Sequence, residues 1–196
     1  TINAEAAEST ASIVLNSLDL TIAEAVVTQG DRTIVATTST DDETERLTLT
    51  LDEPIDSGPL ELSIGFSGPF NDQLVGPYLS QFTDADGSER QLATTQFEAT
   101  HARQCFPCWD EPDMKATFQV DLVIDETDNA VANSAEVSRT PIDGGKAVVS
   151  FAPTVVMSTY LVAFVIGPLE MTDPVDVDGV DLRVVHVPGK DDLTDF

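Results

Sequence analysis

The most informative stretch of this sequence is residues 95–118, TQFEATHARQCFPCWDEPDMKATF. It holds both cysteines, the one tryptophan and one of the two histidines. Residues 99–106 leave room for one or two helical turns, and Pro107 then ends any helix because its ring fixes φ and removes a hydrogen-bond donor. Pro112 stiffens the chain again a few residues later. We therefore predict a rigid loop here, set between elements of another kind.

The segments on either side of this loop alternate between apolar and polar residues. A period of two is typical of a β-strand with one buried face, and it occurs at residues 47–51, 60–66, 118–124 and 180–184. Residues 161–166 are continuously apolar, which is typical of a strand buried on both faces. Turn signals rich in Gly, Asp and Pro separate these runs, at residues 29–31, 52–54, 56–59, 143–145 and 177–179.

These patterns predict a single all-β domain over residues 1–196. No window of the sequence carries a convincing helical stripe, and no composition break or internal repeat divides the chain. We expect an antiparallel β-sandwich or saddle-like domain of about ten to twelve short strands with little helix.

The strongest compositional signal is acidity. The chain has 35 acidic residues against 9 lysines and arginines, which gives a formal net charge of −26. A folded surface of this charge repels nucleic acids and anionic membranes, so we expect neither as a partner. The sequence also lacks an apolar run of the roughly 18–20 residues that span a bilayer.

Three properties can produce such acidity. A disordered acidic tail is disfavoured because the acids are spread along the chain among Val, Leu and Ile. Calcium binding is disfavoured because no D-x-D-x-D-G loop occurs. Adaptation to a salt-rich cytoplasm, where ions screen the repulsion, is the favoured interpretation, and it predicts a halophilic archaeal source. Two cysteines do not form a disulfide framework, so we expect a reducing, cytoplasmic location.

Residues 95–118 resemble the aminopeptidase N family of zinc metallo-aminopeptidases. The N-terminal domain of that family carries T-Q-F-E-x-x-x-A-R-x-x-F-P-C-x-D-E-P-x-x-K-A-x-F. Three further stretches resemble the family in the same order along the chain, at residues 13–20, 71–78 and 157–167. The usual pattern is not followed at three positions, which are His101, Gln104 and Cys105.

The resemblance implies that this chain is one part of an enzyme. In the family, zinc is held by an H-E-x-x-H motif and a downstream glutamate in the next domain. This chain has neither that motif nor the family's G-x-M-E-N substrate loop, and His101 and His186 lie far apart in the sequence. We therefore expect the non-catalytic N-terminal β-domain of a zinc aminopeptidase, with the first strands and the catalytic domain missing.

Several expectations follow from that assignment. This chain should contain no catalytic residue, no metal site and no cofactor, and it should show no peptidase activity by itself. Zinc and the hydrolase activity belong to the parent enzyme. The expected partners are the N-terminus of a peptide substrate and the domain's own catalytic domain.

The family also implies which residues contact the substrate. At the third position of its Q-F-E motif an acid or amide reaches into the active-site cleft and holds the substrate's free amine, and here that residue is Glu98. An α-amino group with a pKa of about 7.7–8.0 is mostly cationic near neutral pH, so a carboxylate suits it. Gln96 lies on the same strand face by the period of two, and we expect it to be a second polar contact.

The remaining motif residues are expected to be structural. Arg103 and Asp110 suggest a buried or half-buried ion pair that fixes the loop. Cys108 suits a small buried apolar position. Glu111 and Pro112 complete the structural motif.

Two other functions remain open from the sequence. The spacing of Cys105 and Cys108 is that of a C-x-x-C redox pair or half a zinc site. A redox pair usually opens a helix in a thioredoxin-like pattern, which this chain lacks, and half a zinc site needs two more ligands. The other alternative is a stand-alone β-sandwich module that binds peptides or proteins without peptidase activity.

Overall fold

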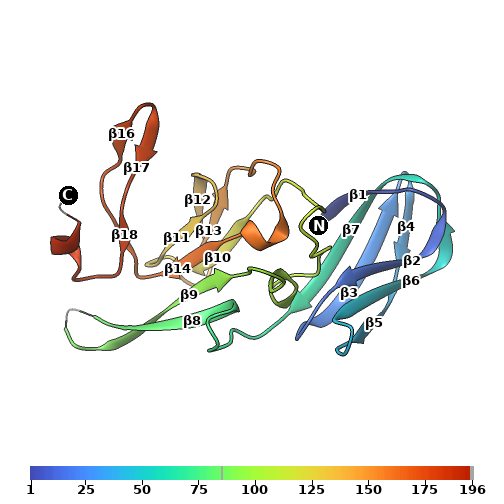
Figure 1. The fold of residues 1–196 in the computed structure, drawn as a ribbon, viewed down its shortest axis with the longest axis horizontal. Helices are drawn as coiled ribbons and strands as arrows, with labels where there is room; N and C mark the ends of the chain where they lie inside the picture. Colours follow the sequence, from blue (N-terminus) through green and yellow to red (C-terminus); the bar gives the residue numbers. More distant parts are fainter. Residues whose placement is uncertain (85, 195–196) are drawn as a thin grey trace. The chain divides into compact units, whose positions relative to one another are not determined.

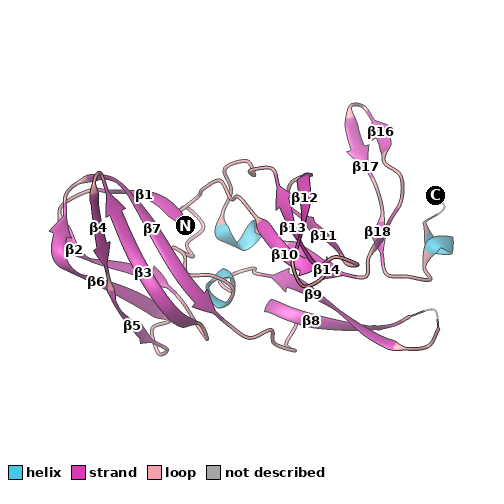
Figure 2. Cartoon of the chain, turned by 180° about the vertical axis from the view of Figure 1, so that it is seen from behind, coloured by secondary structure: helices cyan, strands magenta, loops and turns pink. Residues whose placement is uncertain are grey.

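Strands dominate the computed structural model, which describes residues 1–84 and 86–194 (Figure 1). Figure 2 shows the few helical turns among them. Strands hold 55% of the residues and helix 5%, and the paired strands are antiparallel, which confirms the predicted all-β class. The chain divides into two compact units.

Unit 1 comprises Thr1–Pro69, Phe97–Met114 and Ser158–Tyr160. Its first sheet has the order β1-β7-β3-β4, formed by β1 (Ile2–Ala6), β7 (Gly58–Ser67), β3 (Thr21–Gln29) and β4 (Arg32–Val35). Its second sheet has the order β2-β6-β5, formed by β2 (Thr10–Asn16), β6 (Arg46–Ile55) and β5 (Thr37–Asp41).

Unit 2 comprises Phe70–Gln96, Lys115–Met157 and Leu161–Phe196. Its largest sheet has the order β11-β14-β9-β8, formed by β11 (Asn129–Ala132), β14 (Phe164–Gly167), β9 (Glu89–Gln96) and β8 (Gly76–Thr83). A second sheet has the order β10-β13-β12, formed by β10 (Asp121–Asp125), β13 (Lys146–Phe151) and β12 (Glu136–Ile142).

Two small two-stranded sheets complete the strands of unit 2. β15 (Glu170–Met171) pairs with β18 (Val185–His186), and β16 (Val175–Val177) pairs with β17 (Val180–Leu182). The described residues thus hold 18 strands, more than the expected ten to twelve, and the last four of them are only two or three residues long. The helical turns are all of the 3-10 type: η1 (Ala102–Gln104), η2 (Thr159–Leu161) and η3 (Asp191–Leu193).

The core of unit 1 follows the predicted period of two. Leu47, Leu49 and Leu51 of β6 are 0%, 0% and 4% exposed, and Leu60 and Leu62 of β7 are 8% and 0% exposed. Successive side chains of a strand point to opposite faces, so these leucines all face inward between the two sheets. The strands predicted at residues 47–51 and 60–66 are confirmed.

Three other strand predictions need correction. The strand predicted at 118–124 begins only at Asp121, since the Phe118 backbone bonds with Thr154 instead of joining the ladder. The run at 161–166 is not a strand buried on both faces: β14 begins at Phe164, and Leu161 lies in η2 with 47% of its surface exposed. Residues 180–184 hold the short β17, and its apolar side chains are exposed.

Candidate functional site

Both proposed substrate contacts lie where β9 ends. Gln96 is the last residue of that strand and is exposed, whereas Phe97 is only 1% exposed. The Phe97 carbonyl accepts a hydrogen bond from the His101 N–H at 2.9 Å, so the backbone closes a turn here instead of extending the ladder. Glu98 is exposed in that turn, and its peptide bond to Ala99 is cis. The prediction that Glu98 shares a strand face with Gln96 is therefore wrong.

Beyond the turn, Arg103 lies on η1 and is only 8% exposed. Its Nε donates to Asp110 Oδ2 at 3.0 Å, and its Nη1 donates to Glu45 Oε2 at 2.8 Å. The ion pair predicted between Arg103 and Asp110 is present and buried. We call these three residues the Arg103 cluster. Glu45 was not anticipated, because no spacing in the sequence links it to a residue 58 positions away.

Asp110 connects further segments to this cluster. It is 2% exposed, and its Oδ1 accepts a hydrogen bond from Thr159 Oγ1 at 2.7 Å. Its backbone N–H donates to Asn16 Oδ1 at 3.1 Å. A buried carboxylate is tolerated only when its oxygens are paired, and here both are. Thr159 falls in one of the stretches that resemble the aminopeptidase family, but nothing in the sequence assigned it this bond.

The electrostatics of the cluster favour a charged guanidinium. Burial by itself lowers the pKa of Arg103, but the hydrogen bonds and charges of Asp110 and Glu45 outweigh it, so the pKa is raised. Charge-assisted hydrogen bonds of this kind are among the stronger ones in proteins. The Arg103 cluster thus holds the loop in place, and its charged groups bond to one another.

The two cysteines are free thiols. Burial raises the pKa of Cys105 to about 12. Burial, with the nearby Asp110 charge, also raises the pKa of Cys108, which is 5% exposed. A thiolate is the reactive form of cysteine, so both thiols are poor nucleophiles and poor metal ligands near neutral pH. Cys108 has the environment of a packed core residue, whereas Cys105 is partly exposed.

The rest of the motif anchors the loop through backbone hydrogen bonds and one side-chain bond. Cys108 forms an isolated β-bridge with Asn16, with N···O distances of 2.8 and 3.1 Å. The Trp109 Nε1 donates to the Val14 carbonyl at 2.9 Å. Glu111 and Pro112 are both exposed, and the Pro112 carbonyl accepts a hydrogen bond from Ser158.

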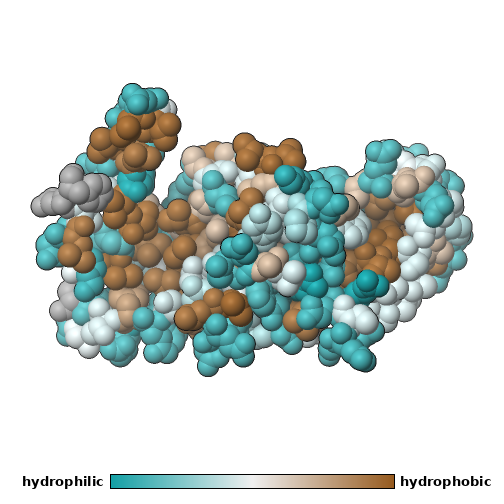
Figure 3. All heavy atoms as spheres, in the orientation of Figure 1, coloured by the Kyte–Doolittle hydropathy of each residue, from teal (hydrophilic) through white to brown (hydrophobic). Residues whose placement is uncertain are grey.

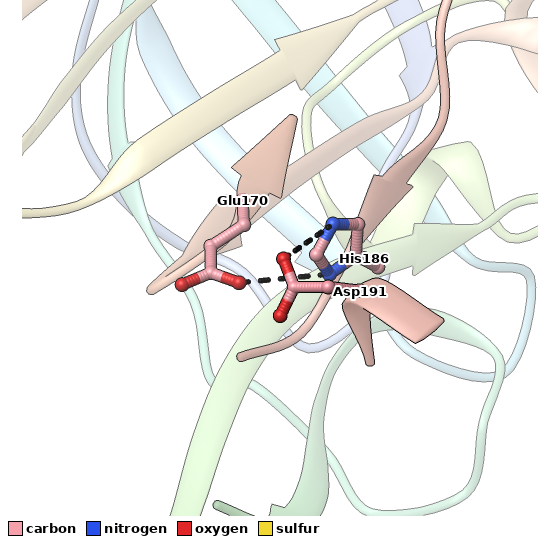
Figure 4. A group of neighbouring side chains, drawn as sticks. All are labelled: Glu170, His186 and Asp191. Carbon is pink, nitrogen blue, oxygen red and sulfur yellow. Dashed lines mark ion pairs between the residues drawn. The ribbon is translucent and has the colours of Figure 1, made fainter. Parts of the chain in front are cut away.

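One group of side chains offers several metal-ligand atoms (Figure 4). Among residues 1–84 and 86–194 it is the only such group, and we call Glu170, His186 and Asp191 the His186 cluster. His186 Nδ1 lies 3.7 Å from Glu170 Oε2, and Nε2 lies 4.0 Å from Asp191 Oδ1. No sequence pattern indicates the partners of His186, because three short elements, β15, β18 and η3, bring this cluster together.

The His186 cluster does not fit a catalytic zinc ion. Its two carboxylates face different ring nitrogens, and Nδ1 also lies 3.0 Å from the Val187 carbonyl. Zinc is bound at about 2.0–2.2 Å by nitrogen and oxygen ligands that converge on one point. One ligand atom from each of the three residues lies within 4.8 Å of the other two. The measured pairs of 3.7 and 4.0 Å are nevertheless longer than the roughly 3.3–3.6 Å that separates two ligands of one zinc ion at such bond lengths.

No helix in the described part of the chain is long and apolar enough to cross a membrane. Residues 1–161 match the family model for the peptidase M1 N-terminal domain. The chain is 41% identical over 180 residues to a puromycin-sensitive aminopeptidase of Caenorhabditis elegans, a match that covers 91% of this chain and 18% of that protein.

Two other relatives match the full length of this chain. It is 36% identical over 197 residues to aminopeptidase 2 of Candida albicans, covering 21% of that protein. It is 34% identical over 196 residues to aminopeptidase N of Acetobacter pasteurianus, covering 54% of that protein. The chain therefore spans between about a fifth and about half of the length of these relatives.

Proposed function

The chain belongs to the family of peptidase M1 N-terminal domains, and from that premise we propose that residues 1–196 serve as the non-catalytic N-terminal domain of a zinc aminopeptidase. The observation that carries this proposal is the match of the full chain to relatives named aminopeptidases. Both compact units belong to that one domain in our proposal, because the chain passes between them five times, after Pro69, Gln96, Met114, Met157 and Tyr160.

The role of the domain in the parent enzyme is to line the substrate cleft and hold the substrate's α-amine. Glu98 suits this role because its carboxylate is exposed while the residues that follow it in the loop are anchored by the buried Arg103. A fixed carboxylate accepts a charge-assisted hydrogen bond from a cationic amine and excludes peptides with a blocked N-terminus. Gln96, also exposed, supplies a second polar contact.

In this proposal zinc belongs to the part of the parent enzyme that lies outside this chain, since the chain lacks the H-E-x-x-H motif that holds zinc in the family. When bound there, zinc would polarise the scissile carbonyl and lower the pKa of a bound water. This chain contributes by positioning the substrate. Glu98 holds the α-amine, and the first peptide bond, one residue from that amine, is thereby placed at the reacting centre.

The test is a substitution in the full enzyme. Glu98→Ala should raise KM for substrates with a free amine and lower kcat/KM about 10- to 100-fold, as expected for loss of a charged hydrogen bond worth about 1.5–3 kcal/mol. Asp113→Asn, which alters another exposed acid of the same loop, serves as the control and should leave the kinetics as they are. Unchanged kinetics for Glu98→Ala would remove this residue from the site.

Peptidase assays with added zinc test the assignment of the domain itself. We expect activity from the full polypeptide and none from the 196-residue chain. A gene that ends at Phe196, with a stable monomer that binds peptides, would favour the stand-alone module instead.

We also propose that the protein works in the salt-rich cytoplasm of a halophilic archaeon. The charge of −26 supports this, and so does the pairing of Asp176 with Asp181 across β16 and β17. Like charges directly opposite each other destabilise a strand pair, and a Debye length of about 3 Å in molar salt largely screens them. Thermal unfolding should therefore occur at a higher temperature in molar potassium chloride than in dilute buffer, and equal midpoints would refute the proposal.

A further inference from the structure

The hairpin of β16 and β17 has two chemically different faces. Val175 pairs with Leu182 and Val177 pairs with Val180, so these four aliphatic side chains share one face. Asp176 and Asp181 pair on the opposite face. The turn is a two-residue loop in which Asp178 and Gly179 have φ values of 54° and 84°. Such a turn sets the register of the strands and therefore separates the faces.

The apolar face of this hairpin is uncovered in the described part of the chain. Its four side chains are between 47% and 64% exposed. The hairpin forms a sheet of its own, and Figure 1 and Figure 2 show it standing apart from the other strands of unit 2. In Figure 3 the apolar atoms of this hairpin lie open below its polar tip. A two-stranded ribbon alone is marginally stable in water, so its apolar face calls for a partner surface.

The size and charge of the hairpin argue against a separate partner molecule. A stable interface between free molecules uses about 20–30 residues on each side, and this face offers four. In dilute buffer, a second copy of the chain, with its net charge of −26, would also be repelled by the three aspartates of the hairpin, Asp176, Asp178 and Asp181. A covalently linked partner needs far less contact area, because the link gives a high effective concentration.

The relatives indicate where such a linked partner comes from. Aminopeptidase 2 of Candida albicans matches this chain in full, hairpin included, and only 21% of that protein is matched. We propose that the apolar face formed by Val175, Val177, Val180 and Leu182 docks on an aliphatic surface of the polypeptide that follows Phe196 in the parent enzyme. This inference rests on the proposed function, and it makes the hairpin a contact that positions the catalytic domain.

Single cysteines on the two faces of the hairpin test the docking. In the full polypeptide, the variants Val180→Cys and Asp181→Cys are labelled with a maleimide. The labelling rate of each variant is divided by the labelling rate of the same variant unfolded in urea. The two positions are adjacent but face opposite sides, and the unsubstituted protein corrects for Cys105 and Cys108. We expect Cys at 180 to react about tenfold slower than Cys at 181, the factor that corresponds to about 1.4 kcal/mol of docking free energy. Val177→Cys with Asp176→Cys repeats the contrast should the first pair fold poorly.

Equal labelling of the two faces in the full polypeptide would overturn the docking. Protection that increases with protein concentration would also overturn it, by identifying a second copy as the partner. Peptidase activity measured on the same samples separates the two proposals. An active enzyme with equal labelling refutes the docking alone, whereas an inactive polypeptide with the labelling contrast refutes the proposed function alone.

Discussion

The Arg103 cluster and the His186 cluster each place one basic side chain between two carboxylates, but they differ in burial and in distance. In the Arg103 cluster the ion pairs measure 2.8 and 3.0 Å, and the Asp110 side chain is 1% exposed. In the His186 cluster they measure 3.7 and 4.0 Å, and the Asp191 side chain is 80% exposed. The two basic side chains are similarly buried, with 10% of Arg103 and 11% of His186 exposed, so the difference lies in the carboxylates. Water reaches the carboxylates of the His186 cluster more easily, and its imidazole is charged only when protonated.

This difference determines what each cluster contributes. The Arg103 cluster has hydrogen-bond geometry at every contact, so removal of Asp110 leaves the buried guanidinium with only the partly exposed Glu45 as its partner. The His186 cluster consists of long, solvated pairs that add little to stability. A basic side chain between two carboxylates is thus a structural core in one place and a looser group with exposed carboxylates in the other. Four measurements can sharpen or break this contrast.

The largest effect is expected for Asp110→Ala. It removes the bonds from Arg103 and Thr159 at once and leaves the buried guanidinium with Glu45 as its remaining partner, which should cost about 3 kcal/mol of the free energy of unfolding. Urea denaturation measures it, with Glu170→Ala in the His186 cluster as the matched control. If both substitutions cost the same small amount, the distinction between the clusters fails.

Alkaline pH should destabilise the loop next to the Arg103 cluster. The pKa of Cys105 is about 12 in the folded chain and 9.0 without burial, so above pH 9 the unfolded chain loses a proton that the folded chain keeps. Stability therefore falls as pH rises, by about 1.4 kcal/mol for each pH unit from this thiol. Any advantage in unfolding midpoint of the unsubstituted chain over Cys105→Ala should shrink or reverse between pH 8 and pH 11. This range follows from the rise of the Cys105 pKa from 9.0 to about 12. A constant difference would mean that the thiol is not buried.

A smaller loss is expected for Thr159→Val, which keeps the shape of the side chain and removes its hydroxyl. Asp110 Oδ1 then loses a 2.7 Å hydrogen bond, and a bond to a charged group is worth about 1.5–3 kcal/mol. Thr159→Ser retains the hydroxyl and should recover most of that loss in the same denaturation assay. A Ser variant as unstable as the Val variant would assign the effect to packing.

The smallest effect is expected for His186→Gln. Exposed pairs contribute about 0–1 kcal/mol, so the free energy of unfolding should change by no more than that. Titration of zinc followed by calorimetry should give the same result for the variant and the unsubstituted chain. Tight zinc binding that His186→Gln abolishes would turn the His186 cluster into a metal site and contradict the geometry.

Local patterns predicted much of unit 1 correctly. The leucines of β6 and β7 alternate cleanly because both strands have one face on the core, and a period of two is readable within a few residues. The ion pair of Arg103 with Asp110 was also predictable, since the two residues lie in one short loop. The sequence is enough to predict a structural feature that depends only on neighbours within one strand or loop.

The same reasoning failed where the backbone found other partners. Glu98 follows a strand in the sequence, yet the bond between His101 and the Phe97 carbonyl turns the chain out of the ladder. The run at residues 161–166 is apolar throughout, but Leu161 lies in η2 with nearly half its surface exposed. Apolarity shows that burial would be favourable, and it does not show which surface will supply it.

The sequence by itself determined the strand-rich class, the family and the acidic surface, because each is expressed in composition or in residues close together along the chain. Only the tertiary structure decided that Glu45, Asn16 and Thr159 join the loop, and that the apolar face of β16 and β17 is uncovered. These features depend on hydrogen bonds and contacts between residues far apart in sequence, whose partners are set by packing and leave no periodic trace in the chain.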